Sequence, residues 1–237
     1  MKLFDYPGVP NPRRLSIFLS EKGLDFPRTQ INLMKGEQFA EDFRCKSPNC
    51  DVPVLELDDG NCISQTNAIC RYLEAEYPEP PLFGRNALEI GLVEMWNNIC
   101  FTNGFQAVAD LFRNGPDWFE GRALIGPHNY DKIPALVERG KQRIANFYQD
   151  IDQHLKGKDY FVKGYFSVAD ITAVVTVDFA TWTGMAVPAT CEHLLNWHQR
   201  VSERPSIKAN IDFATFFQVF LVTTAMTAKG FQGTLRT

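Results

Sequence analysis

The sequence predicts an α/β domain followed by an all-helical domain, and three observations predict it. Over residues 1–77, apolar runs of strand length alternate with apolar residues at helical spacing. A linker with three prolines and a glycine, Pro78 to Gly84, comes next. Beyond it, apolar residues recur at helical spacing only. We therefore expect one domain at residues 1–77 and a helical domain with a C-terminal extension at residues 86–237.

The first domain is expected to run strand, helix, strand, helix, strand, strand, helix. Its strands are expected at Lys2–Tyr6, Phe26–Leu33, Val52–Leu57 and Cys62–Ile63. Its helices are expected at Pro12–Gly23, at Gly36–Phe43 and from Gln65 to Pro78. The turn Asp58–Asn61 joins the last two strands as a hairpin.

The second domain is expected to be built from long helices. They are predicted at Asn86–Arg113, Ile133–Leu155, Ser167–Trp182 and Leu194–Val201. The uncharged stretch between Asp212 and Lys229 is shorter than the roughly 20 apolar residues of a membrane span. We interpret it as a buried or lid-forming C-terminal helix, and we expect no membrane partner.

The composition excludes several classes of protein. The chain has 237 residues, of which 45% are hydrophobic and 22% charged, as in globular proteins rather than disordered chains, collagen or coiled coils. Its net charge is −4. Nucleic-acid binders are usually basic, with Lys and Arg on one face. We therefore expect no nucleic-acid partner.

The cysteines and the N-terminus favour the cytoplasm. Six cysteines are scattered without a Cys-x-x-Cys pair, and the four histidines do not match His-Glu-x-x-His. We therefore expect reduced thiols and no metal site. The first residues lack the long apolar run and the cleavage site of a signal peptide.

Val52-Pro53 is the first motif that bears on chemistry. A proline at the head of a strand lies at an edge or a turn, because it cannot donate to the ladder. With a cis bond, the backbone of Val52 would face outward and could pair with an extended peptide-like ligand. With a trans bond, Pro53 would only start the strand. About 5–6% of X–Pro bonds are cis, so the dipeptide alone favours trans.

The segment Ser64–Ile69 is the second motif, because it follows a strand and opens a helix. Its hydroxyl and amide side chains suit a helix cap, and the free N–H groups of a helix start attract a carboxylate. The turn is therefore either an anion site or a capped helix without a ligand.

Two further helix starts can be identified. In Asn11-Pro12-Arg13-Arg14, Asn11 fits the N-cap and Pro12 the first helical position. An amide and two cations there would favour a thiolate over a thiol, although alone the segment is interpreted as a helix start. Ser167 to Asp170 is a capping box before an apolar run, and we assign it to folding.

Together, the order and spacing of these elements resemble the cytosolic glutathione transferases. Residues 1–77 resemble the family's thioredoxin-like domain, with a mixed four-stranded sheet, and residues 86–210 resemble its helical bundle domain. Val52-Pro53 matches the family's cis-proline element, Gln65-Thr66 its amide–hydroxyl pair, and Ser167–Asp170 its capping box.

Two short segments resemble bacterial members of the family, including those near the nu-like disulfide reductases. They are Asn11–Arg14 and Leu82–Arg85. Members of the family are usually homodimers, so the resemblance implies a second copy of the chain as a partner.

The resemblance implies that glutathione, as co-substrate, lies extended across the small domain. Its cysteinyl unit would pair with Val52 beside Pro53, and its γ-glutamyl carboxylate would bind the hydroxyl and N–H of Thr66, with Gln65 beside it. The glycyl end would be held by Gln38 or Lys46. The acceptor would lie between the domains at Val9, Trp96 and Phe101, with Phe216, Phe217 and Phe220 of the tail as further candidates.

The catalytic residue is where the sequence departs from the family. Many members carry Tyr, Ser or Cys after the first strand, and the loop Pro7–Pro12 has none of them. In the nu-like pattern, Thr and Asn flank a proline, and here Val9 replaces the Thr. Asn11 is therefore the preferred donor to the thiolate, with Tyr6 at the strand end as the second candidate.

Asp51 also departs from the family, whose bacterial members often have a basic or amide side chain there. It would pair with the α-amino group of the ligand, pair with Arg71, or weaken binding.

Three functions remain open at this point. The first is a glutathione transferase whose thiolate attacks a small hydrophobic electrophile. The second is a glutathione-dependent reductase or peroxidase, with a disulfide or peroxide as acceptor. The third is a binding protein without turnover, which the missing loop residue would favour.

Overall fold

The computed structural model of the chain describes residues 1–162 and 164–210. Its first domain holds a four-stranded sheet in the order β2-β1-β3-β4. The strands are β1 (Lys2–Asp5), β2 (Arg28–Gln30), β3 (Val54–Glu56) and β4 (Cys62–Ser64). β1 runs parallel to β2 and antiparallel to β3, and β3 runs antiparallel to β4. The predicted mixed four-stranded sheet is confirmed.

The sheet carries helices on both faces. They are α1 (Pro10–Lys22), α2 (Glu41–Arg44) and α3 (Thr66–Glu76), with 3-10 turns η1 (Leu33–Lys35) and η2 (Glu37–Phe39). Leu3 and Leu55 join the large core that includes α1 and α3. Phe4 and Val54 point the other way and pack with Phe43 of α2, since neighbouring strand residues alternate between faces.

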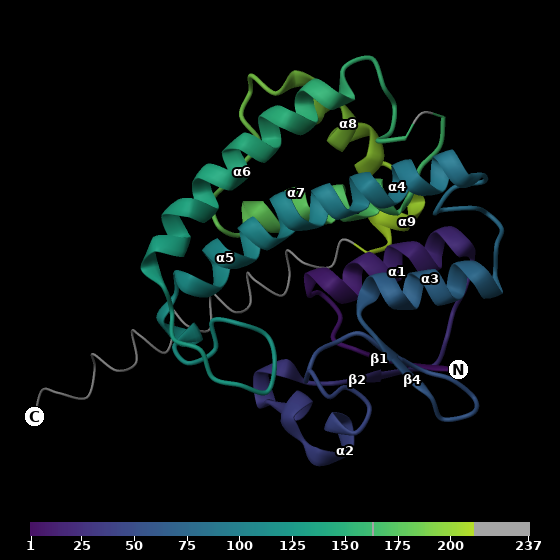
Figure 1. Cartoon of the computed structure of the whole chain (residues 1–237), viewed down its shortest axis with the longest axis vertical. Helices are drawn as coiled ribbons and strands as arrows, with labels where there is room; N and C mark the ends of the chain where they lie inside the picture. Colours follow the sequence, from purple (N-terminus) through teal and green to yellow (C-terminus); the bar gives the residue numbers. More distant parts are fainter. Residues whose placement is uncertain (163, 211–237) are drawn as a thin grey trace, which may run out of the picture.

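The second domain is a helical bundle. Its elements are α4 (Ala87–Ile99), the π-helical segment η3 (Cys100–Phe105), α5 (Gln106–Asn114), the 3-10 turn η4 (Asp117–Phe119), α6 (Pro134–Leu155), α7 (Val168–Thr181), α8 (Glu192–Ser202) and α9 (Pro205–Lys208). α7 is buried over nearly its whole length and contacts α4, α8 and, across the domain boundary, α1. Figure 1 shows α1 and α3 side by side between the sheet and the helical domain.

The start of α7 confirms the predicted capping box. Asp170 accepts hydrogen bonds from the Ser167 N–H and the Ser167 hydroxyl, both at 3.0 Å. It also accepts from the Phe161 N–H at 3.1 Å and the Trp197 indole at 3.2 Å. One carboxylate therefore closes the helix start and joins it to two neighbouring segments.

The expected helix Asn86–Arg113 is helical throughout but changes its hydrogen bonding at η3. Within η3, a Cβ on Gly104 would lie 2.7 Å from the Phe147 ring and 2.8 Å from Thr176. The glycine therefore lets this helix approach α6 and α7 more closely than any other residue would.

Two local predictions are corrected, and one short helix was not predicted. The helix expected at Gly36–Phe43 is wrong, because Gly36 adopts a φ of 74° and separates η1 from η2, leaving only the short α2. The strand expected at Phe26–Leu33 shrinks to β2. The short helix α9 was not expected; it begins at Pro205, in the position that suits proline.

The expected C-terminal helix, with Phe216, Phe217 and Phe220, lies outside the described residues. Within the part of the chain that the structure describes, no helix combines the length and the apolar character needed to cross a membrane.

Candidate functional site

One end of the sheet brings most of the predicted site residues together. The register pairs Val54 with both Phe4 and Ser64. Val52 before β3 and Gln65 after β4 therefore meet at this end, beside the loop from β1 to α1. We call the residues gathered here the sheet-end site: Tyr6, Val9, Asn11, Asp51, Val52, Pro53, Gln65 and Thr66.

Val52 presents its backbone at this site. The bond between Val52 and Pro53 is cis, which decides between the two forms that the dipeptide left open. Among the described residues, the N–H and the C=O of Val52 make no hydrogen bond. A free donor and acceptor on one residue match the backbone of an extended peptide, as in strand addition.

The start of α3 forms the second part of the site. Gln65, the residue before the helix, has a φ of 73°, which is uncommon for a residue other than glycine. The Thr66 hydroxyl donates to the Asn11 carbonyl at 3.1 Å. Because this hydroxyl proton is engaged, the N–H groups of the first turn are the donors that remain for a carboxylate.

Asp51 is held by neutral donors. Its carboxylate accepts from the Ser47 hydroxyl at 2.8 Å, the Asn49 amide at 2.8 Å and the Gln65 amide at 2.6 Å. The expected alternative of an ion pair with Arg71 is wrong, because Arg71 pairs with a glutamate of α4 at 2.6 Å. In the described part of the chain no cation pairs with Asp51, so its negative charge stays beside Gln65.

Asn11 lies in the first turn of α1. The helix begins at Pro10 with Val9 at the N-cap, so the prediction of Asn11 as the cap is wrong; Pro10 takes the position expected for Pro12. The Asn11 Oδ1 accepts from the Arg14 Nη1 at 3.2 Å. With its oxygen engaged, the amide NH₂ is the end of Asn11 that can donate to a ligand.

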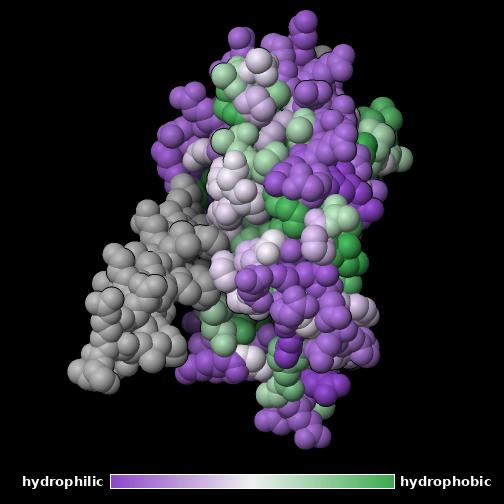
Figure 2. All heavy atoms as spheres, turned by 90° about the vertical axis from the view of Figure 1, so that its left-hand side faces the viewer, coloured by the Kyte–Doolittle hydropathy of each residue, from purple (hydrophilic) through white to green (hydrophobic). Residues whose placement is uncertain are grey.

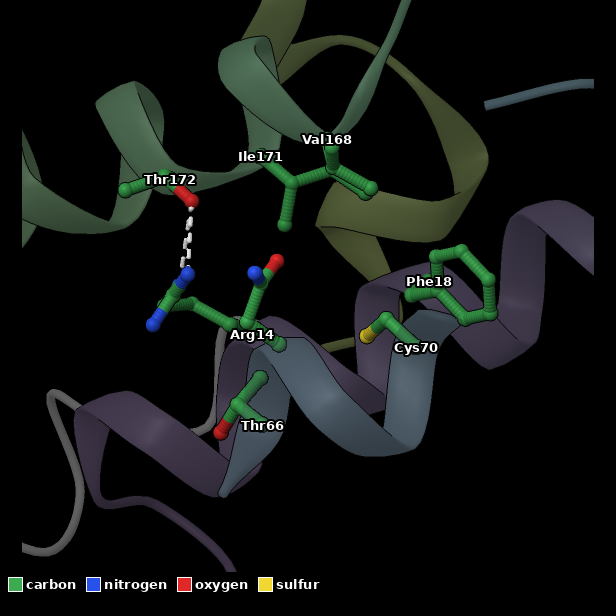
Figure 3. Close-up of a pocket in the computed structure, with 8 residues that line it drawn as sticks. Arg14, Phe18, Thr66, Cys70, Val168, Ile171 and Thr172 are labelled. Carbon is green, nitrogen blue, oxygen red and sulfur yellow. Dashed lines mark hydrogen bonds between the residues drawn. The ribbon is translucent and has the colours of Figure 1, made fainter. Parts of the chain in front are cut away.

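Arg14 is buried and holds Asn11 from the interface between the domains. Its Nε and Nη2 donate to the Thr172 hydroxyl at 3.1 and 2.9 Å (Figure 3). That hydroxyl donates to Asn97 at 2.6 Å, and the Asn97 amide donates to Asn67 at 3.0 Å. The network runs from α1 through α7 and α4 to α3, so both helices that start at the sheet-end site are fixed to the helical domain.

A small cavity lies beside this network, between α1, α3 and α7 (Figure 3). Its volume of about 10 Å³ is roughly that of one water molecule. Burial lowers the pKa of Arg14 to about 10 and raises the pKa of Cys70 to about 12. At neutral pH the arginine is therefore charged and the thiol is neutral. We assign this cavity to the domain interface.

Arg13 is also directed to the helical domain. It donates to Asp178 at 2.6 Å and to the Asn210 carbonyl at 2.9 Å. Although burial opposes ionisation, hydrogen bonds from His198 and Arg13 hold the pKa of Asp178 below its ordinary value. The helical domain engages the guanidinium groups of both Arg13 and Arg14, which supports the interpretation of their segment as a helix start.

Tyr6 packs in the smaller apolar cluster with Val52 and Val9. It is 6% exposed. Burial raises the pKa of Tyr6, so its hydroxyl stays protonated at neutral pH. Tyr6 can therefore act as a hydrogen-bond donor and not as a base.

The two candidates for the glycyl end differ in position. Lys46 forms an ion pair with Glu56, and Glu56 pairs in register with Lys2 at the opposite end of the sheet. The charge of Lys46 is therefore engaged by Glu56, although its Nζ also lies 5.1 Å from the ring of Phe4, which pairs with Val54. Gln38 lies in η2, and its Oε1 is buried without a hydrogen-bond partner among the described residues.

Two of the predicted acceptor residues, Trp96 and Phe101, also differ in position. Trp96 stacks on His154 with ring centroids 3.6 Å apart, so it belongs to the interior of the helical domain and not to the site. Phe101 lies 5.3 Å from the Arg14 guanidinium. It is therefore close to the network that holds Asn11, while Trp96 is not.

The hydrogen-bond network of Arg14 was not predicted from the sequence. Its signal was weak, since Asn67, Asn97 and Thr172 lie far apart in the sequence and each helix carries other polar residues as well. No three His, Cys, Asp or Glu side chains are grouped as metal ligands in residues 1–162 and 164–210.

Comparison with known proteins agrees with this architecture. The N-terminal domain of glutathione S-transferases matches residues 1–75, and the C-terminal domain matches residues 130–212. Glutathione S-transferase 2 of Saccharomyces cerevisiae is 33% identical over 213 residues, which cover 88% of either chain.

Solved structures give the same result. Gtt2 of Saccharomyces cerevisiae superposes with a TM-score of 0.81 at 31% identity, covering 88% of this chain and 99% of that one. A glutathione S-transferase domain-containing protein of Marinobacter aquaeolei also reaches 0.81, at 33% identity, covering 87% of this chain and 100% of that one.

Proposed function

The chain belongs to the glutathione S-transferase family, and from this premise we propose that it activates the glutathione thiol for attack on a small hydrophobic electrophile. Glutathione binds along the sheet-end site. Its cysteinyl backbone pairs with Val52, and its γ-glutamyl carboxylate lies at the start of α3. The sulfur then lies toward the start of α1.

The orientation of Asn11 carries the proposal. Arg14 engages the amide oxygen of Asn11 at 3.2 Å, which leaves the NH₂ group to donate to the sulfur. A donor stabilises the thiolate more than the thiol, and lowering a thiol pKa by one unit needs about 1.4 kcal/mol. One amide together with the positive end of α1 supplies an effect of this size.

The chemical step needs no protein nucleophile. The thiol proton leaves to solvent, the thiolate forms a bond to the electrophilic carbon, and the leaving group departs with the bonding electrons. The loop between Tyr6 and Asn11 has no cysteine, which disfavours a mixed disulfide between protein and glutathione. Phe101, beside Arg14, supplies apolar surface for the acceptor.

Turnover with two acceptors tests the proposal. A chloro-nitro arene reports transfer to carbon, and hydroxyethyl disulfide reports reduction of a disulfide by two glutathione molecules. We expect turnover of the arene and a loss of about 10- to 100-fold in Asn11→Ala. Asn196→Ala, on the exposed face of α8, serves as the control.

Other outcomes would change the conclusion. Activity only with the disulfide would replace transfer by disulfide reduction. Glutathione binding without turnover of either acceptor would leave a binding protein. Loss in Tyr6→Phe with no change in Asn11→Ala would move the thiol donor to Tyr6.

We further propose that two copies associate through α4. Leu88 and Met95 are 70% and 44% exposed, and a Cβ on Gly91 between them would meet nothing within 4 Å. The spacing places all three on one open helix face. Light scattering of Leu88→Lys should show monomers where the unaltered chain shows dimers.

The six cysteines are free, and free thiols are typical of a reducing compartment. On this ground we propose that the protein acts in the cytoplasm.

A further inference from the structure

The loop between α5 and α6, residues 115–133, reaches from the helical domain to the small domain. Figure 1 shows it beside the segment that contains η1, η2 and α2. The Arg122 guanidinium lies 4.2 Å from the Phe39 ring of η2. A Cβ on Gly126 would lie 3.4 Å from the Asn49 side chain. The loop therefore touches the small domain at two separate points.

One contact point borders the sheet-end site, and the other lies in the segment that follows β2. Asn49 donates to Asp51, which directly precedes Val52. Phe39 follows Gln38, and η2 belongs to the segment after β2, from which Leu33 packs on the apolar cluster that contains Val52.

The strand order fixes what lies at each end of an extended ligand. Across the sheet end, β4 leads to α3, β3 starts after Val52, and β2 leads to η1 and η2. A ligand with its γ-glutamyl end at α3 and its cysteinyl unit at Val52 therefore directs its glycyl end toward η2.

Arg122 is suited to bind a carboxylate at this place. Its guanidinium carbon lies over the Phe39 ring, 4.2 Å from the centroid, and a cation over a ring face keeps its N–H donors for a second partner. Among residues 1–162 and 164–210, no acidic side chain forms an ion pair with Arg122, whereas Lys46 is engaged by Glu56. The neighbouring Gln38 Oε1 lacks a partner and can accept the glycyl N–H.

The loop also exposes an apolar surface on this side of the molecule. Trp118, Leu124 and Ile125 are 52%, 50% and 48% exposed. Figure 2 shows hydrophobic side chains in patches among hydrophilic ones on that side. Trp118, Leu124 and Ile125 carry no charge, so they cannot pair with a carboxylate as Arg122 can.

We propose that Arg122 binds the glycyl carboxylate of glutathione, so that the α5–α6 loop fastens the ligand to both domains. This inference rests on the proposed function, since it requires glutathione at the sheet-end site. It names a binding residue that comes from the helical domain.

The test compares glutathione with γ-glutamylcysteine, which lacks the glycyl unit, by titration calorimetry. Arg122→Ala should weaken glutathione binding about tenfold, as expected for one charge-assisted contact, and should change γ-glutamylcysteine binding less than about twofold. Arg139→Ala, an exposed arginine on α6, should change neither. Hydrogen exchange of residues 115–133 should slow with glutathione and stay unchanged with γ-glutamylcysteine.

Three results would overturn the inference. Equal weakening of both ligands in Arg122→Ala would show a general effect on the fold. No weakening of either, or a glycine-dependent loss in Lys35→Ala instead, would assign the carboxylate to another cation. If the unaltered protein binds neither ligand, the proposed function fails together with the inference. The first two results would overturn the role of Arg122 alone and leave the proposed function intact.

Discussion

Asp170 and Asp51 show how the two domains use the same side chain differently. Asp170 is completely buried and accepts four hydrogen bonds, all from within the helical domain. Asp51 accepts from three neutral side chains at the sheet-end site. The carboxylate of Asp170 is thus used up by its own domain, while the small domain leaves the charge of Asp51 and the backbone groups of Val52 for a ligand.

At the interface between the domains, one polar network both stabilises the fold and positions a group that binds the ligand. Arg14 is as buried as a core residue, yet it orients Asn11 at the sheet-end site. The same network therefore stabilises the fold and positions a ligand-binding group, and substitutions in it should affect both properties.

The largest effect is expected for Asp170→Ala. It would leave the Phe161 and Ser167 N–H groups and the Trp197 indole buried without an acceptor. We expect the free energy of unfolding to fall by about 3–5 kcal/mol, with unchanged glutathione affinity of the folded protein. Urea unfolding measures it, with Asp152→Ala as the control.

Asp152 accepts a single backbone hydrogen bond, from Leu194 at 2.8 Å. Asp152→Ala should therefore lower the free energy of unfolding by about 1 kcal/mol. A similar loss in Asp152→Ala and Asp170→Ala would contradict the central role given to Asp170.

Arg14→Met should have an intermediate effect on both properties. It removes the donors to Thr172 and Asn11, and we expect a loss of about 2–3 kcal/mol in unfolding free energy. The pKa of bound glutathione should rise, because Asn11 loses its orienting partner. If folded Arg14→Met kept the thiol pKa of glutathione bound to the unaltered protein, the Arg14 network would not act on the site.

Asp51→Asn should affect the ligand and not the fold. With the γ-glutamyl unit at the start of α3, as proposed, its α-ammonium group would lie near the carboxylate beside Gln65, so we expect glutathione affinity to fall about 5- to 10-fold. An N-acylated glutathione, which lacks that charge, should bind both forms equally. Tighter glutathione binding by Asp51→Asn would mean that Asp51 opposes the ligand.

The last prediction concerns pH. Burial raises the pKa of Asp170 to about 6 from 3.8, so the folded state holds its proton where the unfolded state loses it. This contribution to stability is complete below pH 3.8 and is lost as the pH rises to about 6. The unfolding free energy of the unaltered protein should therefore fall over this range relative to Asp170→Asn, and a constant difference would contradict the shift.

The sequence predicted features that depend on neighbouring residues. The capping box from Ser167 to Asp170 and the strands of the sheet follow from local patterns. The cis form of Val52-Pro53 came from the family resemblance, since the dipeptide alone favours trans.

Contacts between segments that are distant in the sequence could not be predicted from it. Lys46 and Trp96 were assigned to the site by analogy, and their actual partners, Glu56 and His154, cannot be identified from spacing. The hydrogen bonds from Arg14 to Thr172 join the two domains, and no local sequence pattern indicates them. Short helices such as η1 and η2 depend on the φ of Gly36, which its neighbours did not indicate.

The pKa of the thiol of bound glutathione tests the account most directly. Thiolate absorbance measured across the pH range, on the unaltered protein and on Asn11→Ala, gives this value. We predict a pKa well below the free value of about 8.5 in the unaltered protein and a return toward it in Asn11→Ala. An unshifted pKa, or the same lowered pKa in both proteins, would contradict the assignment of Asn11 as the group that activates the thiol.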